Sequence, residues 1–163
     1  MQKQAARAKS GRKGRGRKNS VANIRFEGRR QVVDKIELRK LQEFLRQSFG
    51  APGIKVGLDP KDPDQAQVTY GERKIGTIAV DDEDGDRSFS FAMQIPVERP
   101  VIQEYLRRLF ENDELKIVAR MKKTDSVELN NGDDFLGIVS ADDPKGKSFT
   151  LQMAILDFDL EDF

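Results

Sequence analysis

The chain has 163 residues, of which 37% are hydrophobic and 35% charged; its net charge at pH 7 is +1, and it contains neither cysteine nor histidine. This composition excludes disulfides, thiolate nucleophiles and cysteine zinc sites, and it removes the commonest general base and transition-metal ligand. No apolar run approaches the roughly 18 residues of a membrane helix, and the basic N-terminus lacks the apolar stretch of a secretory signal, so we expect a cytoplasmic protein without a membrane span.

The small net charge hides a basic N-terminal arm and an acidic body. Residues 1–33, the arm, hold 11 Lys or Arg and one acid, for a net charge of +10. Residues 34–163, the body, hold 18 bases and 27 acids, for a net charge of −9. Glycine, serine and alanine separate the bases of residues 1–20, a composition that buries too little surface to fold, so we expect the arm to be disordered.

The body begins with a predicted helix and a β-meander. Asp34 and Glu37 form a capping-box pattern at the start of the helix, and Gly50 is placed to end it. Apolar residues at helical spacing predict its buried face: Leu38, Leu41, Phe44, Leu45 and Phe49. Four strands are predicted after it, at 54–58, 66–70, 74–80 and 87–95, with a loop at 60–64 and turns at Gly71 and 81–86.

The same pattern returns 61 positions later, which indicates a duplication. Leu41-Gln42-Glu43-Phe44-Leu45-Arg46 aligns with Ile102-Gln103-Glu104-Tyr105-Leu106-Arg107. Gly71 and Gly76 align with Gly132 and Gly137, and after the loss of one residue Met93 aligns with Met153. A period of this length that recurs once is typical of a duplicated domain, not of a solenoid. We predict a first copy at 34–96 and a second copy at 97–163.

In the second copy, Pro100 fits the first turn of a helix, and four strands are predicted at 115–119, 126–130, 135–141 and 148–156. The helix face comprises Val101, Ile102, Tyr105, Leu106, Leu109 and Phe110. The final residues, 156–163, either extend the last strand or form a short acidic tail. Each copy thus combines one helix with about four strands, which predicts an α+β fold. Because so few residues join the copies, we predict that they pack as an internal pseudo-dimer; two separate domains that do not pack together are the alternative.

The acidic loop Asp81–Asp86 suggests a calcium or magnesium site but does not fit one. In an EF-hand register, Val80 and Phe91 would occupy ligand positions, and bases replace acids in the second copy. Pro144 and Gly146 suit a tight turn, so both loops are predicted to be hairpin turns, and we predict neither a metal site nor a cofactor.

Other residues with chemical potential also have structural interpretations. Gly76 and Gly137 lie inside strands and indicate a bulge or a close backbone approach, to the helix or the other copy. Ser88 and Ser148 have no histidine partner, which excludes a conventional triad, and we expect them to flank the hairpin turns; composition leaves a Ser–Lys pair open. Met93 and Met153 are expected in the core.

The basic arm carries the strongest functional signal. Bases interleaved with glycine make a polycation that can follow a phosphate backbone, and the absence of aromatic residues before Phe26 removes base stacking. The predicted nucleic-acid-binding residues are Arg7, Lys9, Arg12, Lys13, Arg15, Arg17, Lys18, Arg25, Arg29 and Arg30. The alternatives are a solubilising tail and an arm that folds onto its own acidic body.

The body resembles an uncharacterised alphaproteobacterial family, the domain of unknown function 3126. The resemblance rests on three stretches: residues 81–89, residues 105–110, and residues 135–161 with the closing run Gln152-Met153-Ala154-Ile155-Leu156-Asp157. Members of that family look like single copies, so this chain resembles a tandem fusion. The resemblance implies an alphaproteobacterial, cytoplasmic protein and supplies no activity or site residue.

These observations favour a non-enzymatic binding or adaptor module whose arm contacts nucleic acid, RNA or DNA, with a monomeric body. A protein-interaction module, or an assembly subunit whose arm docks on an acidic protein surface, is the second hypothesis. A metal-dependent enzyme built on the acidic loops is the third.

Overall fold

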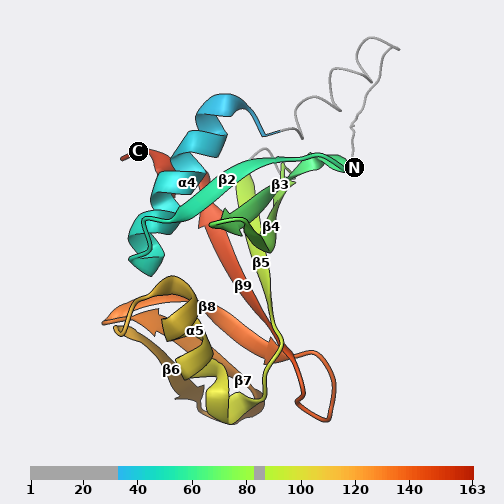
Figure 1. Cartoon of the computed structure of the whole chain (residues 1–163), viewed down its shortest axis with the longest axis vertical. Coiled ribbons are helices and arrows are strands. Elements are labelled where there is room, and N and C mark those ends of the chain that lie inside the picture. The colour runs from blue at the N-terminus through green and yellow to red at the C-terminus, as the bar shows by residue number, and fades with distance from the viewer. Residues whose placement is uncertain (1–32, 83–86) are drawn as a thin grey trace, which may run out of the picture. The chain divides into compact units, whose positions relative to one another are not determined.

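The computed structural model describes residues 33–82 and 87–163, and its elements carry the labels of Figure 1. Residues 1–32 and 83–86 lie outside this part of the chain, so the expectations of a disordered arm and of a turn at 83–86 are not addressed by it. Residues 33–163 form one unit, and Val33 is buried in its core.

Helix α4 (Lys35–Phe49) has both predicted caps. The Glu37 amide donates to Asp34 Oδ1 at 2.8 Å, and the Asp34 amide donates to Glu37 Oε1 at 3.1 Å, which completes the capping box. Gly50 ends the helix in the left-handed conformation, with φ of 60°. The buried residues, Leu41, Leu45 and Phe49, follow the predicted face.

Four strands follow α4, as predicted: β2 (Ile54–Asp59), β3 (Asp62–Tyr70), β4 (Arg73–Asp81) and β5 (Ser88–Ile95). The predicted loop at 60–64 is too long, because β3 already begins at Asp62 and pairs there with Asp59. The Asp59 side chain accepts the Lys61 amide at 2.9 Å and closes the turn within two residues, so the chain needs no longer loop.

The second copy repeats the meander with different ends. Its elements are the 3-10 turn η2 (Arg99–Val101), helix α5 (Ile102–Phe110), strands β6 (Leu115–Arg120), β7 (Lys123–Asn131), β8 (Asp134–Ala141) and β9 (Phe149–Leu156), and the 3-10 turn η3 (Asp157–Leu160).

The prediction of Pro100 in the first α-helical turn is wrong: Pro100 lies in η2, and Val101 leaves helical geometry (φ −110°, ψ 5°) before α5 starts. Both predictions for the last residues are also wrong, because η3 turns back and buries Leu160.

The eight strands of residues 33–82 and 87–163 form one antiparallel sheet in the order β2-β3-β4-β5-β9-β8-β7-β6 (Figure 1). Each copy contributes four neighbouring strands, and the copies meet where β5 pairs with β9. Ala92 lies opposite Gln152 in that ladder, and these residues occupy the same position in the two copies. The pairing is therefore the self-complementary kind that an approximate two-fold axis produces. The described part of the chain is mostly sheet, with the helices α4 and α5, so the fold is α+β in a broad sense.

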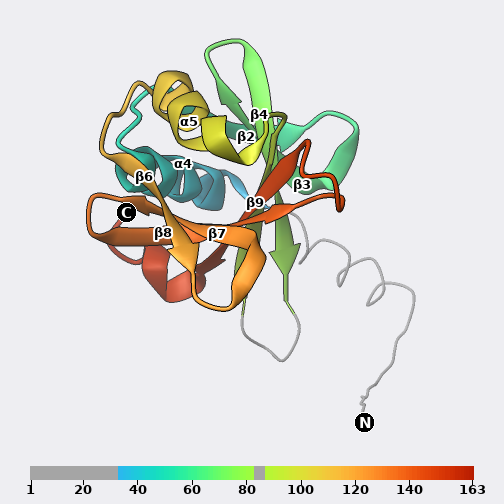
Figure 2. The ribbon, with the colours of Figure 1, turned by 90° about the horizontal axis from the view of Figure 1, so that it is seen from below.

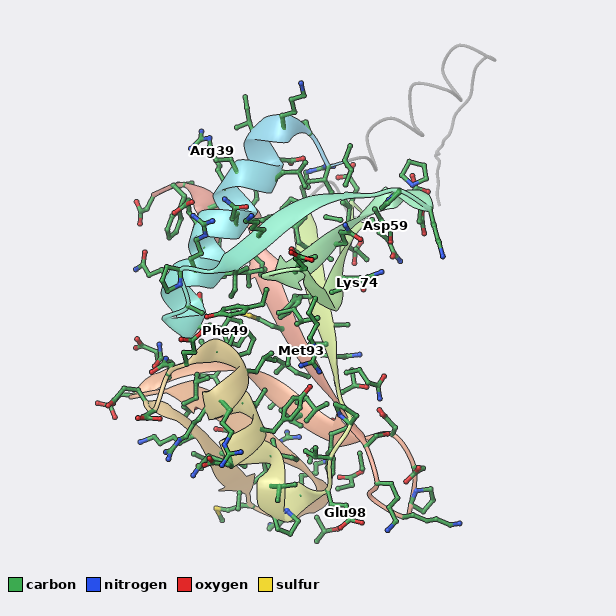
Figure 3. All side chains as sticks on the ribbon, in the orientation of Figure 1. Arg39, Phe49, Asp59, Lys74, Met93 and Glu98 are labelled. Carbon is green, nitrogen blue, oxygen red and sulfur yellow. The ribbon has the colours of Figure 1, made fainter. Side chains whose placement is uncertain are left out.

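Both helices lie against the same face of the sheet (Figure 2). Phe49 and Phe110, which are equivalent residues of α4 and α5, stack with ring centroids 4.7 Å apart, and Phe91 of β5 meets Phe49 edge-on at 6.1 Å. Phe49 lies at the end of α4 that faces the second copy (Figure 3). Met93 and Met153 are buried, as predicted. The two copies thus share one core.

The repeated helix motif ties each helix to an outer strand of the sheet. Gln42 Oε1 accepts the Val56 amide of β2 at 3.0 Å, and Arg46 Nε donates to the Ile54 carbonyl at 2.7 Å. The equivalent bonds in the second copy join Gln103 to Ile117 and Arg107 to Leu115. Because β2 and β6 are the edges of the sheet, these side chains occupy backbone groups that would otherwise invite another strand. The motif is therefore structural.

The glycines inside strands mark close backbone contacts. A Cβ at Gly76 would lie 2.4 Å from the Ala92 carbonyl oxygen, and one at Gly137 would lie equally near the Gln152 carbonyl oxygen. Register shifts fall opposite both glycines, so a bulge and a close approach occur together. The approach is to the neighbouring strand of the same copy, which corrects the expectation of a contact with the helix or the other copy.

Candidate functional site

The predicted nucleic-acid-binding residues cannot be placed. All ten, from Arg7 to Arg30, lie in residues 1–32, outside the described part of the chain. The candidate site that the structure does describe is a groove along the second copy's helix that the first copy completes; the sequence did not single it out.

The groove lies along α5 and has a volume of about 700 Å³. Its walls come from α5, from the turn between β3 and β4, and from the segment that joins the two copies. The lining residues are Tyr70, Arg73, Val97, Val101, Glu104, Tyr105, Arg108 and Leu109.

An apolar stripe forms the floor of the groove. Tyr105 and Leu109 lie four residues apart on one side of α5, and Val101 at the end of η2 lines the groove beside them. Val101 is 47% exposed, while Tyr105 and Leu109 are partly buried against the core. The three residues belong to the predicted apolar helix face, but the fully buried positions are Ile102, Leu106 and Phe110. The predicted apolar face therefore includes residues that are not fully buried in the core, and these residues line the groove.

Charged and phenolic groups surround the stripe. Arg73 Nη2 donates to the Tyr105 hydroxyl at 3.0 Å, and Arg108 Nε donates to Glu104 Oε2 at 2.7 Å. The Tyr70 hydroxyl donates to Glu111 Oε2 at 2.9 Å. Burial, and then the bond to the Glu111 carboxylate, raise the pKa of Tyr70 above its ordinary value, so this phenol stays protonated as a donor at neutral pH. The groove can therefore hold an apolar group beside a carboxylate.

The predicted hairpin turn of the second copy is confirmed. Gly146 is left-handed, with φ of 65°, and its amide lies 2.9 Å from Asp143 Oδ1. Ser148 Oγ and Thr150 Oγ1 donate to the Asp142 carboxylate at 2.7 and 2.6 Å. These bonds, Thr150 first, lower the pKa of Asp142. Ser148 thus closes the turn, as predicted, through bonds that suit a structural hydroxyl.

The acidic residues do not assemble a metal site within the described part of the chain. No group of three Asp or Glu side chains among residues 33–82 and 87–163 is placed to hold a metal ion. Of the acidic loop, Asp81 and Asp82 are described, while Glu83 and Asp84 fall outside.

The family comparison agrees with the internal repeat. The sequence profile of the proteins of unknown function DUF3126 matches twice in tandem, at residues 37–98 and 97–159. The chain belongs to this family. The DUF3126 matches cover the helix and the meander of each copy, and they exclude the arm. No match was found among curated proteins or among solved structures. Among the described residues, no helix combines the length and the apolar character of a membrane span.

Alignment of the two DUF3126 copies contains the signal that would have found the groove. Lys40 and Ser48 of α4 correspond to Val101 of η2 and Leu109 of α5. Val101 is 47% exposed and Leu109 is only partly buried, so these apolar replacements remain in part on the surface and point to the groove. Reading each helix face alone does not reveal it.

Proposed function

We propose that the protein is a non-enzymatic binding or adaptor module whose basic arm contacts nucleic acid without strong sequence preference. The observation that carries the proposal is the division of charge, +10 in residues 1–33 against −9 in residues 34–163. A flexible polycation gains affinity from released counterions, whereas an acidic body gains nothing from phosphate. The arm is thus the part of the chain suited to a polyanion, and the body is left for a second contact.

The body is proposed to act as a monomeric pseudo-dimer in the cytoplasm. Support comes from the pairing of β5 with β9 and from the Gln42 and Gln103 bonds at the outer strands, which leave little free sheet edge for a further chain. Sedimentation of the full chain at micromolar concentration is expected to give the mass of one chain.

The test is binding to labelled duplex DNA and to RNA of mixed sequence across a series of salt concentrations. Changing Arg12, Lys13, Arg15, Arg17 and Lys18 together to Gln removes half of the net charge of the arm. If each contacts one phosphate, affinity at low salt falls by roughly 10²- to 10³-fold, the salt dependence flattens, and the thermal midpoint stays unchanged.

A matched control removes five positive charges from the body. Exposed Lys55, Lys61, Lys116, Lys123 and Lys145 are changed together to Gln, and affinity is expected to stay within about threefold of the parent. Equal losses in both variants, or no binding by the parent at low salt, would overturn the arm as the contact.

A protein-interaction module remains the second candidate function. In that case the arm docks on an acidic protein surface, and nuclease treatment leaves captured partners in place. If the arm instead binds its own body, deleting residues 1–32, which leaves the buried Val33 in place, would lower the thermal midpoint.

A further inference from the structure

The groove beside α5 lies on the helix face that, in the first copy, is covered by the end of the chain. Phe44 and Tyr105 are equivalent residues of α4 and α5. The ring of Phe44 meets the ring of Phe163 edge-on at 5.9 Å, and Leu160 of η3, which lies against α4 (Figure 1), is only 2% exposed. Tyr105 instead lines the groove. The second copy thus leaves open a face that the first copy keeps covered.

The covering segment has a definite chemistry. Residues 157–163 read Asp-Phe-Asp-Leu-Glu-Asp-Phe, so four carboxylates alternate with two phenylalanines and a leucine. The segment reaches α4 with Leu160 and Phe163, which are spaced three residues apart and joined by a 3-10 turn. The molecule therefore contains an example of what this type of helix face accepts.

The open face differs from the covered one in a consistent direction. Lys40, Gln47 and Ser48 of α4 correspond to Val101, Arg108 and Leu109 beside the groove. Arg73, which the first copy supplies to the groove, corresponds to Asp134 of the second copy. Two polar positions become apolar, and two flanking positions become basic. The first change favours apolar side chains in the bound segment, and the second favours carboxylates over neutral or basic groups.

The charges around the groove are unevenly paired. Arg108 is neutralised by Glu104, although both side chains are largely exposed, and Glu111 accepts from Tyr70. Arg73 donates to the Tyr105 hydroxyl, and no carboxylate of the described residues pairs with it. Arg73 is thus the cation with a free charge next to the apolar stripe.

We propose that this groove docks a short acidic segment of a partner protein, with an aromatic side chain on Val101, Tyr105 and Leu109 and a carboxylate beside Arg73. The chain's own C-terminal segment is already seated on α4 through buried Leu160, so a separate protein supplies the ligand. The site is distinct from the arm, and it holds whether or not the arm binds nucleic acid.

The direct test is the anisotropy of a fluorescein-labelled peptide with the sequence of residues 157–163, titrated with the full chain. Saturable binding is expected with a dissociation constant on the order of 10–100 µM, because so short a segment buries far less surface than a standard interface. A peptide with both phenylalanines changed to alanine is expected to bind at least about tenfold more weakly.

Two variants install the residues of the covered face. Arg73→Asp and the double change Val101→Lys with Leu109→Ser are each expected to weaken peptide binding at least about tenfold. The matched control is Arg39→Asp, on the exposed side of α4 and remote from the groove (Figure 3). It changes the net charge by the same amount as Arg73→Asp and is expected to leave peptide binding unchanged. Amide chemical-shift changes mapped on α5 in the parent chain support the site even if a variant fails to fold.

Three outcomes would overturn the proposal. Binding that survives both groove variants means that the peptide displaces the C-terminal segment from α4. Binding that disappears when the five arm bases from Arg12 to Lys18 are changed to Gln means that the arm captures the acidic peptide. That result leaves the proposed nucleic-acid contact of the arm intact. A concentration-dependent dimer of the full chain that Arg73→Asp abolishes means that a second copy of this protein occupies the groove.

Discussion

The two copies build the same four strands behind helices of different design. Helix α4 has 15 residues, a capping box and a glycine end, whereas α5 has 9 residues, no side-chain cap and Glu111 in the left-handed position at its end. Both bury three equivalent apolar residues against the sheet. Packing against the shared core, and not capping, is therefore what the two helices have in common.

The copies also differ in how each hairpin is attached to its helix. Arg87 holds Glu37 through two bonds, at 2.5 and 2.9 Å, and both side chains are mostly buried. Lys147 holds Glu98, the equivalent acid, through one bond at 2.6 Å in an exposed position. Equivalent positions form an ion pair in both copies, but only the pair of the first copy is largely shielded from water.

The largest expected effect tests the symmetry of the core. Phe91 and Leu151 are equivalent, and each is at most 1% exposed. Phe91→Asp and Leu151→Asp each bury an unpaired charge and are expected to cost about 4 kcal/mol or more of unfolding free energy, by urea denaturation. Two unfolding transitions, with only one affected by each change, would instead mean that the copies fold independently.

The stacked rings between the helices test the shared core more finely. Phe49→Ala and Phe110→Ala are each expected to cost about 3–4 kcal/mol, because each removes a fully buried ring. The double variant is expected to cost about 0.5–1.5 kcal/mol less than the sum of the single changes, because the rings contact each other. Strict additivity would contradict a direct stack.

The cover over α4 is a feature of the first copy alone. Leu160→Ala is expected to cost about 2–3 kcal/mol, since it empties a buried site between η3 and the core. Pro100→Ala, at the equivalent position, is the matched control and is expected to change stability by less than about 1 kcal/mol, because no residue of η2 is buried. Equal losses would show that the linker and the C-terminal segment are equivalent covers.

The two hairpin contacts are expected to differ in energy. Arg87→Ala removes a bidentate bond to a carboxylate and the contact with the Phe89 ring, and it is expected to cost about 1–3 kcal/mol. Lys147→Ala breaks the exposed counterpart and is expected to leave the urea midpoint nearly unchanged. If the two variants lose equal stability, burial is not what separates the two contacts.

The smallest expected effect depends on pH. Hydrogen bonds from Thr150, Ser148 and Gln94 lower the pKa of Asp142 below its ordinary value of 3.8. A lowered folded-state pKa stabilises the fold above the unfolded value, and this contribution disappears as the pH falls through the folded pKa. Asp142→Asn is therefore expected to cost no more than about 0.5 kcal/mol at pH 7, since water screens this exposed carboxylate. The difference should shrink as the pH falls below 3.8 and vanish below the still lower folded-state pKa. A difference that grows on acidification would contradict this account.

The amino-acid sequence by itself determined the local elements and the duplication. The capping box at Asp34, the end of α4 at Gly50 and the turn at Gly146 depend on interactions within a few residues, so the local pattern was sufficient. The alternation in β5 and β9 identified which side chains face the core. The predicted start of the second helix was wrong because Pro100 suits a 3-10 turn as well as an α-helical one. The end of α5 had no glycine to mark it, because Glu111 occupies the left-handed position.

Only the tertiary structure decided what those faces meet. Periodicity shows that Phe91 is inward but not that β5 pairs with β9, because a strand satisfies its backbone equally with any neighbour of compatible register. The stack of Phe49 on Phe110 and the return of Leu160 onto α4 join residues more than 60 positions apart. The groove lies open beside α5, whereas η3 packs on the equivalent face of α4. That difference depends on a contact between η3 and a helix more than 100 positions earlier in the chain, which the periodicity of a single element does not specify.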